Sequence, residues 1–191
     1  MKSTKRIILG SNSPRRRELL RGLDIEFTVD TGNNFKESPE PGVEAHRIPV
    51  DMSVGKSHGF HRELEDDEIL ITSDTVVITE GRVLGKPHSR EEAVGMLKAL
   101  SGKTHEVVTA VTIRDNTAEK TFSCSSFVTF EKLADSEIEY YIDKYKPYDK
   151  AGAYGVQEWI GYVAISRLEG SFYNVMGFPV HRVYRELQEF I

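Results

Sequence analysis

The sequence has one cysteine, no apolar run long enough to cross a bilayer and no excess of positive charge. The single Cys124 excludes an intrachain disulfide and a cysteine-based zinc site, and its alternating surroundings favour a small buried residue over a catalytic thiol. The N-terminal apolar run is too short for a signal peptide, so the expected compartment is the cytoplasm. Lys and Arg number 25 against 30 Asp and Glu, a formal net charge of −5. This balance disfavours a protein that coats DNA or RNA, which needs a basic face.

Common nucleotide-binding and catalytic motifs are missing as well. The chain has no GxxxxGK[ST] loop, no GxGxxG after a strand and no GxSxG elbow. The six histidines include no HExxH pair, and the spacing of His58 and His61 alone does not predict a metal site. What the 191 residues do have is 39% hydrophobic and 29% charged side chains, the composition of a soluble globular protein.

The apolar pattern predicts strands and helices that alternate only in part. Strands are expected at 7–9, 25–29, 69–78, 107–113, 121–130 and 162–168. Helices are expected after Pro14, from Pro49 toward Leu64, after Ser89, after a cap at Asp135 and from Pro179, with a loop over 30–47. Because 107–113 and 121–130 would form a hairpin, we expect an α/β fold with a mixed β-sheet and flanking helices.

Three consecutive arginines stand at the start of the first expected helix, in the stretch GSNSPRRRELL. On a helical projection Arg16 shares the buried side with Leu19 and Leu20, Arg15 lies at its edge and Arg17 faces solvent. Positive charges at a helix N-terminus oppose the macrodipole, and a bound anion would reverse that penalty. Two interpretations are open: an anion-binding site, or a structural arginine paired with a carboxylate.

Asp74 lies in a short polar interruption, SDT, of the otherwise apolar strand ILITSDTVVI. A carboxylate there is costly unless it is paired, hydrogen-bonded or bound to a metal. Asp74 is therefore either a functional group or a side chain that bonds nearby backbone in a strand bend. Lys56, Lys86 and Glu37 taken singly are typical of solvated surface charges. Together, such basic groups and carboxylates suit a polyphosphate with a divalent metal, without naming a reaction.

Five motifs in a fixed order, GSNSPRRRELL, SDTVV, GKP, HEVVTAV and YDKAGAYGVQ, resemble those of the Maf family of nucleoside triphosphate pyrophosphatases, over about 7–187. The resemblance implies an elongated fold similar to the inosine triphosphate pyrophosphatases, with residues 1–191 in a single domain of two lobes around a cleft. It also implies hydrolysis of nucleoside triphosphates to the monophosphate and pyrophosphate with Mg²⁺ or Mn²⁺. The implied partners are the nucleotide and a second copy in a homodimer, with no nucleic acid and no membrane.

The resemblance further implies a role for individual residues. Asp74 matches the family's proton acceptor, and Asp74 and Glu37 would hold the metal. The residues that match substrate-binding positions are Ser11, Arg15, Arg16, Lys56, Thr75, Lys86 and Gln157. Of these, Arg16, Thr75 and Gln157 match positions tied to the choice of base.

Thr75 and the AGAYGVQ loop ending at Gln157 resemble the branch that prefers dTTP and UTP, with modified pyrimidine nucleotides as further candidates. One alternative is a 7-methyl-GTP or inosine-type pyrophosphatase, which Thr75 and Gln157 disfavour. Another is a nucleotide-sensing regulator of cell division without turnover, which would not need Asp74. The chain departs from the family in the Gly-rich segment IPVDMSVGKSHGF around Lys56, where Ser57 replaces a frequent alanine.

Overall fold

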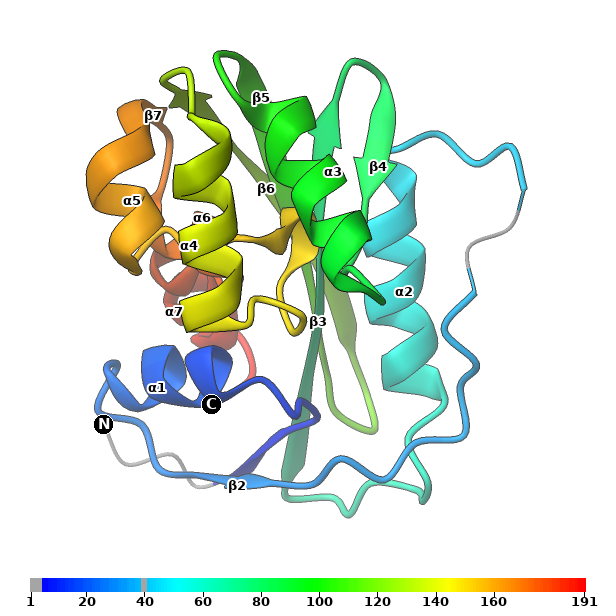
Figure 1. The fold of residues 1–191 in the computed structure, drawn as a ribbon. Helices are drawn as coiled ribbons and strands as arrows, with labels where there is room; N and C mark the ends of the chain where they lie inside the picture. The colour runs from blue at the N-terminus through cyan, green and yellow to red at the C-terminus, as the bar shows by residue number, and fades with distance from the viewer. Residues whose placement is uncertain (1–4, 39–40) are drawn as a thin grey trace. The chain divides into compact units, whose positions relative to one another are not determined.

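The computed structural model describes residues 5–38 and 41–191, in which one mixed sheet is accompanied by helices (Figure 1). The strands are β1 (Arg6–Leu9), β2 (Phe27–Val29), β3 (Glu68–Thr79), β4 (Arg82–Leu84), β5 (Thr104–Arg114), β6 (Glu119–Phe130) and β7 (Ile165–Glu169). The strand order is β2–β1–β3–β5–β6–β7, with β4 paired to β3. Strand β1 runs parallel to β2 and β3, whereas the β3–β4 and β6–β7 pairs are antiparallel. The predicted mixed α/β fold class is confirmed.

The chain divides into two compact units, and helices occur in both. The helices are α1 (Pro14–Arg21), α2 (Arg47–His58), α3 (Arg90–Leu100), α4 (Asp135–Tyr145), α5 (Trp159–Ala164), α6 (Phe172–Val175) and α7 (Val180–Leu187), with a 3-10 turn η1 (Ala151–Ala153). Unit 1 takes the described residues of Met1–Asp74, Thr109–Cys124 and Gly177–Ile191. Unit 2 takes Thr75–Val108 and Ser125–Met176. No helix within the described ranges is both long and apolar enough to cross a membrane.

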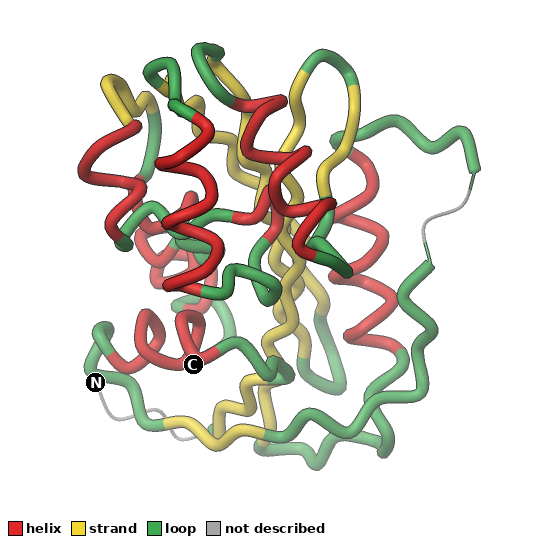
Figure 2. Tube along the Cα trace, in the orientation of Figure 1, coloured by secondary structure: helices red, strands yellow, loops and turns green. Residues whose placement is uncertain are grey.

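In unit 1 the parallel strands carry the buried core. Ile8 and Leu70 lie on neighbouring strands, in register with each other, and pack with Phe60 and Leu64. The unbroken buried apolar runs at 7–9 in β1 and 69–71 in β3 are typical of parallel strands that are covered on both faces. The connection between β2 and α2 is a long loop, as predicted (Figure 2). Within it, Asn33 forms an isolated bridge with Phe60, which follows α2.

In unit 2 helices α3 and α4 lie side by side (Figure 1). Leu97 and Leu100 of α3 pack with Ile138 and Ile142 of α4 in one apolar cluster. Their spacings of three and four residues place each pair on one face of its helix, which is why the sequence pattern predicted both helices.

Several predicted boundaries differ from those observed. Helix α2 begins at Arg47 and ends at His58 rather than running from Pro49 to Leu64. Asp135 is the first residue of α4 and not its cap, which is Ala134, and the Glu137 carboxylate accepts the N–H of Ala134.

A larger error concerns the strand expected at 162–168, whose first part belongs to helix α5. Ile160 and Ala164 are four residues apart and both are fully buried, which is a helical spacing. The β-branched Val163 and Ile165 obscured this pattern, and only Ile165–Glu169 forms strand β7.

Candidate functional site

The register of β1 and β3 brings Ser11 level with the residues just before Asp74. Leu9 pairs with Ile71, and the N–H of Gly10 donates to the Ile71 carbonyl at 2.9 Å. A Cβ atom on Gly10 would meet Cγ2 of Thr72 at 3.1 Å, so glycine allows the chain to leave β1 close to β3. The buried Ser11 therefore stands at the carboxyl end of β1, where α/β proteins bind ligands.

An ion-pair cluster forms around Lys56 in unit 1. Its Nζ atom lies 2.8 Å from Oδ1 of Asp74 and 3.0 Å from Oε2 of Glu37. The side chains of Lys56 and Asp74 are only 15% and 17% exposed, whereas Glu37 is 59% exposed. Asp74 is thus a paired carboxylate inside the strand, and three of the residues implied by the resemblance are in direct contact.

Arg16 lies against the same part of unit 1. Its Nε donates to the carbonyl of Gly177 and its Nη1 to the carbonyl of Ser73, both at 2.9 Å, and Nη1 also reaches Oγ of Ser11 at 3.4 Å. Burial lowers the pKa of Arg16, while the nearby charge of Asp74 acts in the opposite direction. Arg16 therefore holds the backbone immediately before Asp74. Sequence reasoning missed the Gly177 carbonyl, because no local pattern links it to α1.

The other arginines of α1 lie on either side of Arg16. Arg15 is half-buried and close enough for its charge to lower the pKa of Arg16. Arg17, predicted to face solvent, is instead half-buried, and its Nε is buried with no hydrogen-bond partner among the described residues. The reason is that Arg17 precedes Leu20 by three residues, and such pairs share one side of a helix.

The remaining candidates, Thr75, Lys86 and Gln157, belong to unit 2. Thr75 is the next residue of β3 after Asp74 and is half-buried, while Lys86 is exposed after β4. Gln157 is half-buried, and its Oε1 is buried without a hydrogen-bond donor in the described part of the chain. A buried acceptor of this kind calls for a partner, and a donor on a bound ligand would supply one.

The loop that carries Gln157 is anchored by a polar network that sequence reasoning missed. The hydroxyl of Tyr141 donates to the Glu158 carboxylate and accepts the N–H of Gly155 at 2.9 Å. Glu158 also pairs with Lys150 at 3.1 Å. Burial raises the pKa of Tyr141, and the hydrogen bond to Glu158 raises it further. The loop is therefore held at Gly155 and at Glu158, on either side of Gln157.

Comparison with known proteins identifies the family of this chain. The model of the Maf-like protein family matches residues 6–190. The chain belongs to the Maf family. The dTTP/UTP pyrophosphatase of Porphyromonas gingivalis is 52% identical to this Maf protein over 97% of this chain and 94% of its own. The proteins of the same name from Parabacteroides distasonis and Bacteroides thetaiotaomicron are 51% and 48% identical, over 97% and 96% of this chain and 96% and 95% of their own.

A solved structure of lower similarity is the Ham1 protein of Coxiella burnetii. It matches 68% of this Maf chain and 74% of its own at 14% identity, with a TM-score of 0.42. The resemblance to the Maf family inferred from the five motifs is confirmed by the family model and the close relatives.

The donor set of this Maf protein fits a divalent cation. Oδ1 of Asp74 and Oε2 of Glu37 lie 2.8 Å and 3.0 Å from the Nζ atom of Lys56. Because both oxygens contact the same atom, the two carboxylates lie close to each other. Among residues 5–38 and 41–191, no three His, Cys, Asp or Glu side chains are grouped around one metal position. Mg²⁺ needs no such cage, because it usually binds one or two carboxylates together with water and substrate phosphates.

Proposed function

We propose that this protein hydrolyses nucleoside triphosphates, with dTTP, UTP and modified pyrimidine nucleotides as substrates, to the monophosphate and pyrophosphate. The observation that carries the proposal is the largely buried Asp74 carboxylate, paired with Lys56 at 2.8 Å beside a second carboxylate, Glu37. A buried carboxylate close to cationic groups is a functional-site candidate on physical grounds. The similar relatives named dTTP/UTP pyrophosphatase supply the reaction class.

In the proposed reaction, a water molecule attacks the α-phosphorus. The new bond forms between that phosphorus and the water oxygen, and the bond to the bridging oxygen breaks as pyrophosphate leaves. Asp74 orients this water and accepts its proton, while Lys56 and Arg15 offset the negative charge on the phosphates. Lys86 is assigned the same electrostatic role from the family resemblance.

Asp74 and Glu37 are the residues that would hold Mg²⁺ or Mn²⁺. When bound, such a cation neutralises charge on phosphate oxygens. Holding a cation weakens a carboxylate as a base, so the two roles proposed for Asp74 compete with each other.

Base choice is assigned to Gln157, with Thr75 and Arg16 as the further positions tied to it by the resemblance. Uracil and thymine carry an N3–H donor between two carbonyls, whereas N3 of cytosine has no hydrogen. The buried Oε1 of Gln157, which accepts no hydrogen bond from the described residues, would accept that N3–H.

The same proposal includes a single domain over residues 1–191, a homodimer and a cytoplasmic location. It includes no nucleic-acid or membrane partner.

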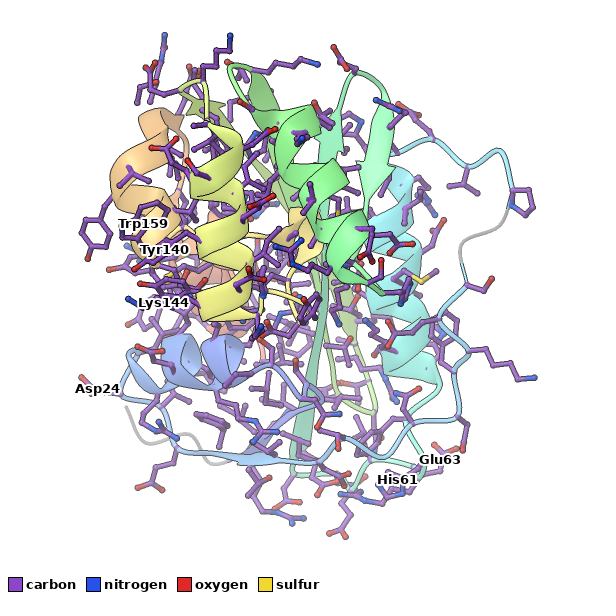
Figure 3. All side chains as sticks on the ribbon, in the orientation of Figure 1. Asp24, His61, Glu63, Tyr140, Lys144 and Trp159 are labelled. Atoms are coloured by element: carbon purple, nitrogen blue, oxygen red, sulfur yellow. The ribbon has the colours of Figure 1, made fainter. Side chains whose placement is uncertain are left out.

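The test is pyrophosphate release from a panel of nucleoside triphosphates with Mg²⁺ or Mn²⁺. Asp74→Asn should lower turnover about 100-fold or more, the usual contribution of a general base. The matched control is Asp24→Asn, because Asp24 is exposed, is labelled at the surface in Figure 3 and has a φ of +54° that asparagine tolerates.

Near-normal turnover in a folded Asp74→Asn protein would overturn the assignment. If high Mn²⁺ restores the variant, Asp74 acts as a metal ligand, and if it does not, Asp74 acts as the base. A wild-type protein that releases no pyrophosphate from any nucleotide would favour the nucleotide-sensing alternative.

A further inference from the structure

Gly55 within α2 and Gly59 just after the end of the helix face a single aromatic ring. A Cβ atom on Gly55 would lie 2.3 Å from Cε2 and Cζ of Phe35. A Cβ atom on Gly59 would lie 2.6 Å from Cβ of Phe35. Neither position can carry a larger side chain unless Phe35 moves. Gly55 and Gly59 thus form a notch, here called the α2 notch, which is filled by Phe35.

Hydrogen bonds fix the same loop to the end of α2. The Asn33 side-chain amide donates to the carbonyl of Lys56 at 2.6 Å, and the N–H of Asn34 donates to the carbonyl of Gly59 at 2.7 Å. The Lys56 carbonyl is one of the last four of the helix, which lack a partner within it. Asn33 also accepts the N–H of Phe35 at 2.8 Å, so the turn before the ring is itself fixed.

The contact continues past the end of the helix. The N–H of His61, labelled in Figure 3, donates to the carbonyl of Gly32 at 3.2 Å. The His61 ring lies 2.9 Å from a carboxylate oxygen of Asp30, and a Cβ atom on Gly32 would meet that ring at 2.3 Å. Residues 30–35 are therefore held along their length against residues 55–61.

This arrangement ends two residues before Glu37. The ion pair between Glu37 and Lys56 has one largely exposed partner, and an ion pair of that kind contributes little on its own. The Phe35 ring in the α2 notch and the backbone hydrogen bond of Asn34, in contrast, fix the part of the loop that directly precedes Glu37. The position of the Glu37 carboxylate thus depends on where residues 30–35 are held along α2.

We propose that Phe35, seated in the α2 notch, is a positioning residue that holds the Glu37 carboxylate beside Lys56 and Asp74. This inference rests on the function proposed above, in which Glu37 helps to hold the cation. It assigns a purpose to Gly55, which the interior of a helix would otherwise disfavour.

The direct test is Gly55→Ala, because the added methyl group displaces the Phe35 ring. Its matched control is Gly95→Ala in α3, where the glycine is exposed and an added Cβ meets nothing within 4 Å. We expect kcat to fall about 10-fold or more in Gly55→Ala, as for other groups that orient a metal ligand, with a smaller change in the KM for nucleotide. Gly95→Ala should keep the wild-type kcat. Phe35→Ala removes the ring without adding bulk and serves if Gly55→Ala does not fold.

Two further measurements separate positioning from general destabilisation. Combining Gly55→Ala with Glu37→Gln should give a kcat no lower than Glu37→Gln alone, because both changes remove the same contribution. Hydrogen exchange of the amides of residues 30–37 should be faster in Gly55→Ala and unchanged in Gly95→Ala.

Fully additive losses in the double variant, or a wild-type kcat in Gly55→Ala while Glu37→Gln is impaired, would overturn the positioning role and leave the proposed function standing. A wild-type protein that turns over no nucleotide would refute the proposed function instead. In that case the faster exchange of residues 30–37 would still support the notch as the device that holds the loop.

Discussion

Replacing Arg16 with alanine removes two guanidinium hydrogen bonds of 2.9 Å, one to the Ser73 carbonyl and one to the Gly177 carbonyl. A hydrogen bond from a charged donor contributes about 1.5–3 kcal/mol, so two of them give about 3–6 kcal/mol. Arg16 is only half-buried, so water can reach part of the vacated space and the lower end of that range applies. At roughly 2–4 °C per kcal/mol for a chain of this size, we expect the melting temperature to fall by roughly 6–12 °C.

The assay is thermal unfolding followed by circular dichroism, together with steady-state kinetics at a temperature where the variant is folded. We expect kcat to fall as well, because Arg16 orients the backbone directly before Asp74. Arg16→Lys should recover only part of either loss, since an ammonium cannot reproduce the forked geometry. Arg21→Ala, exposed in the last turn of the same helix, is the control. An Arg16→Ala protein as stable and as active as this control would refute the reasoning.

The remaining predictions concern unit 2. Gln157→Ala should lower the ratio of kcat/KM for UTP to that for CTP by about 5- to 150-fold, which is the cost of one unpaired polar group. An equal loss of kcat/KM on both substrates would instead assign Gln157 to the phosphates or the loop. Burial lowers the pKa of His105 to about 4, from an unfolded value near 6.5, so the folded protein binds fewer protons between these values. Stability should therefore fall as the pH drops from about 6.5 to about 4, by up to about 1.4 kcal/mol per pH unit from this group. His105→Gln should remove this part of the slope in urea unfolding series, and a pH-independent difference between the two proteins would contradict it.

Much of the fold could be predicted because its signals are local. The Ser13 cap accepts the N–H of Arg16 at 3.4 Å, and the apolar run of β3 and the turn at Asp115 are equally visible in a few residues. Helix α5 was missed because its buried pair, Ile160 and Ala164, is interrupted and followed by residues of high strand propensity, such as Val163 and Ile165. Propensity and burial disagree there, and burial decides.

In the candidate site, too, the residues could be predicted from local motifs and their contacts could not. Asp74, Lys56 and Glu37 could be proposed from motifs, but not that one ammonium joins both carboxylates. The contact of Phe35 with Gly55 was invisible, since it joins a loop to a helix 20 residues later and leaves no periodic pattern. Glycine in the α2 sequence indicated only a weak helix, whereas in the structure it marks a close approach.

The division of unit 1 into three separated segments has a consequence for synthesis of the protein. Domains usually fold from the N-terminus as the ribosome makes them. Here every residue of unit 2 has been made once Met176 is added, whereas unit 1 still awaits Gly177–Ile191. The Gly177 carbonyl that Arg16 binds is translated 161 residues after Arg16 itself. A nascent chain can therefore complete the second unit first, and the backbone beside Asp74 acquires its full set of contacts only when translation has passed Gly177.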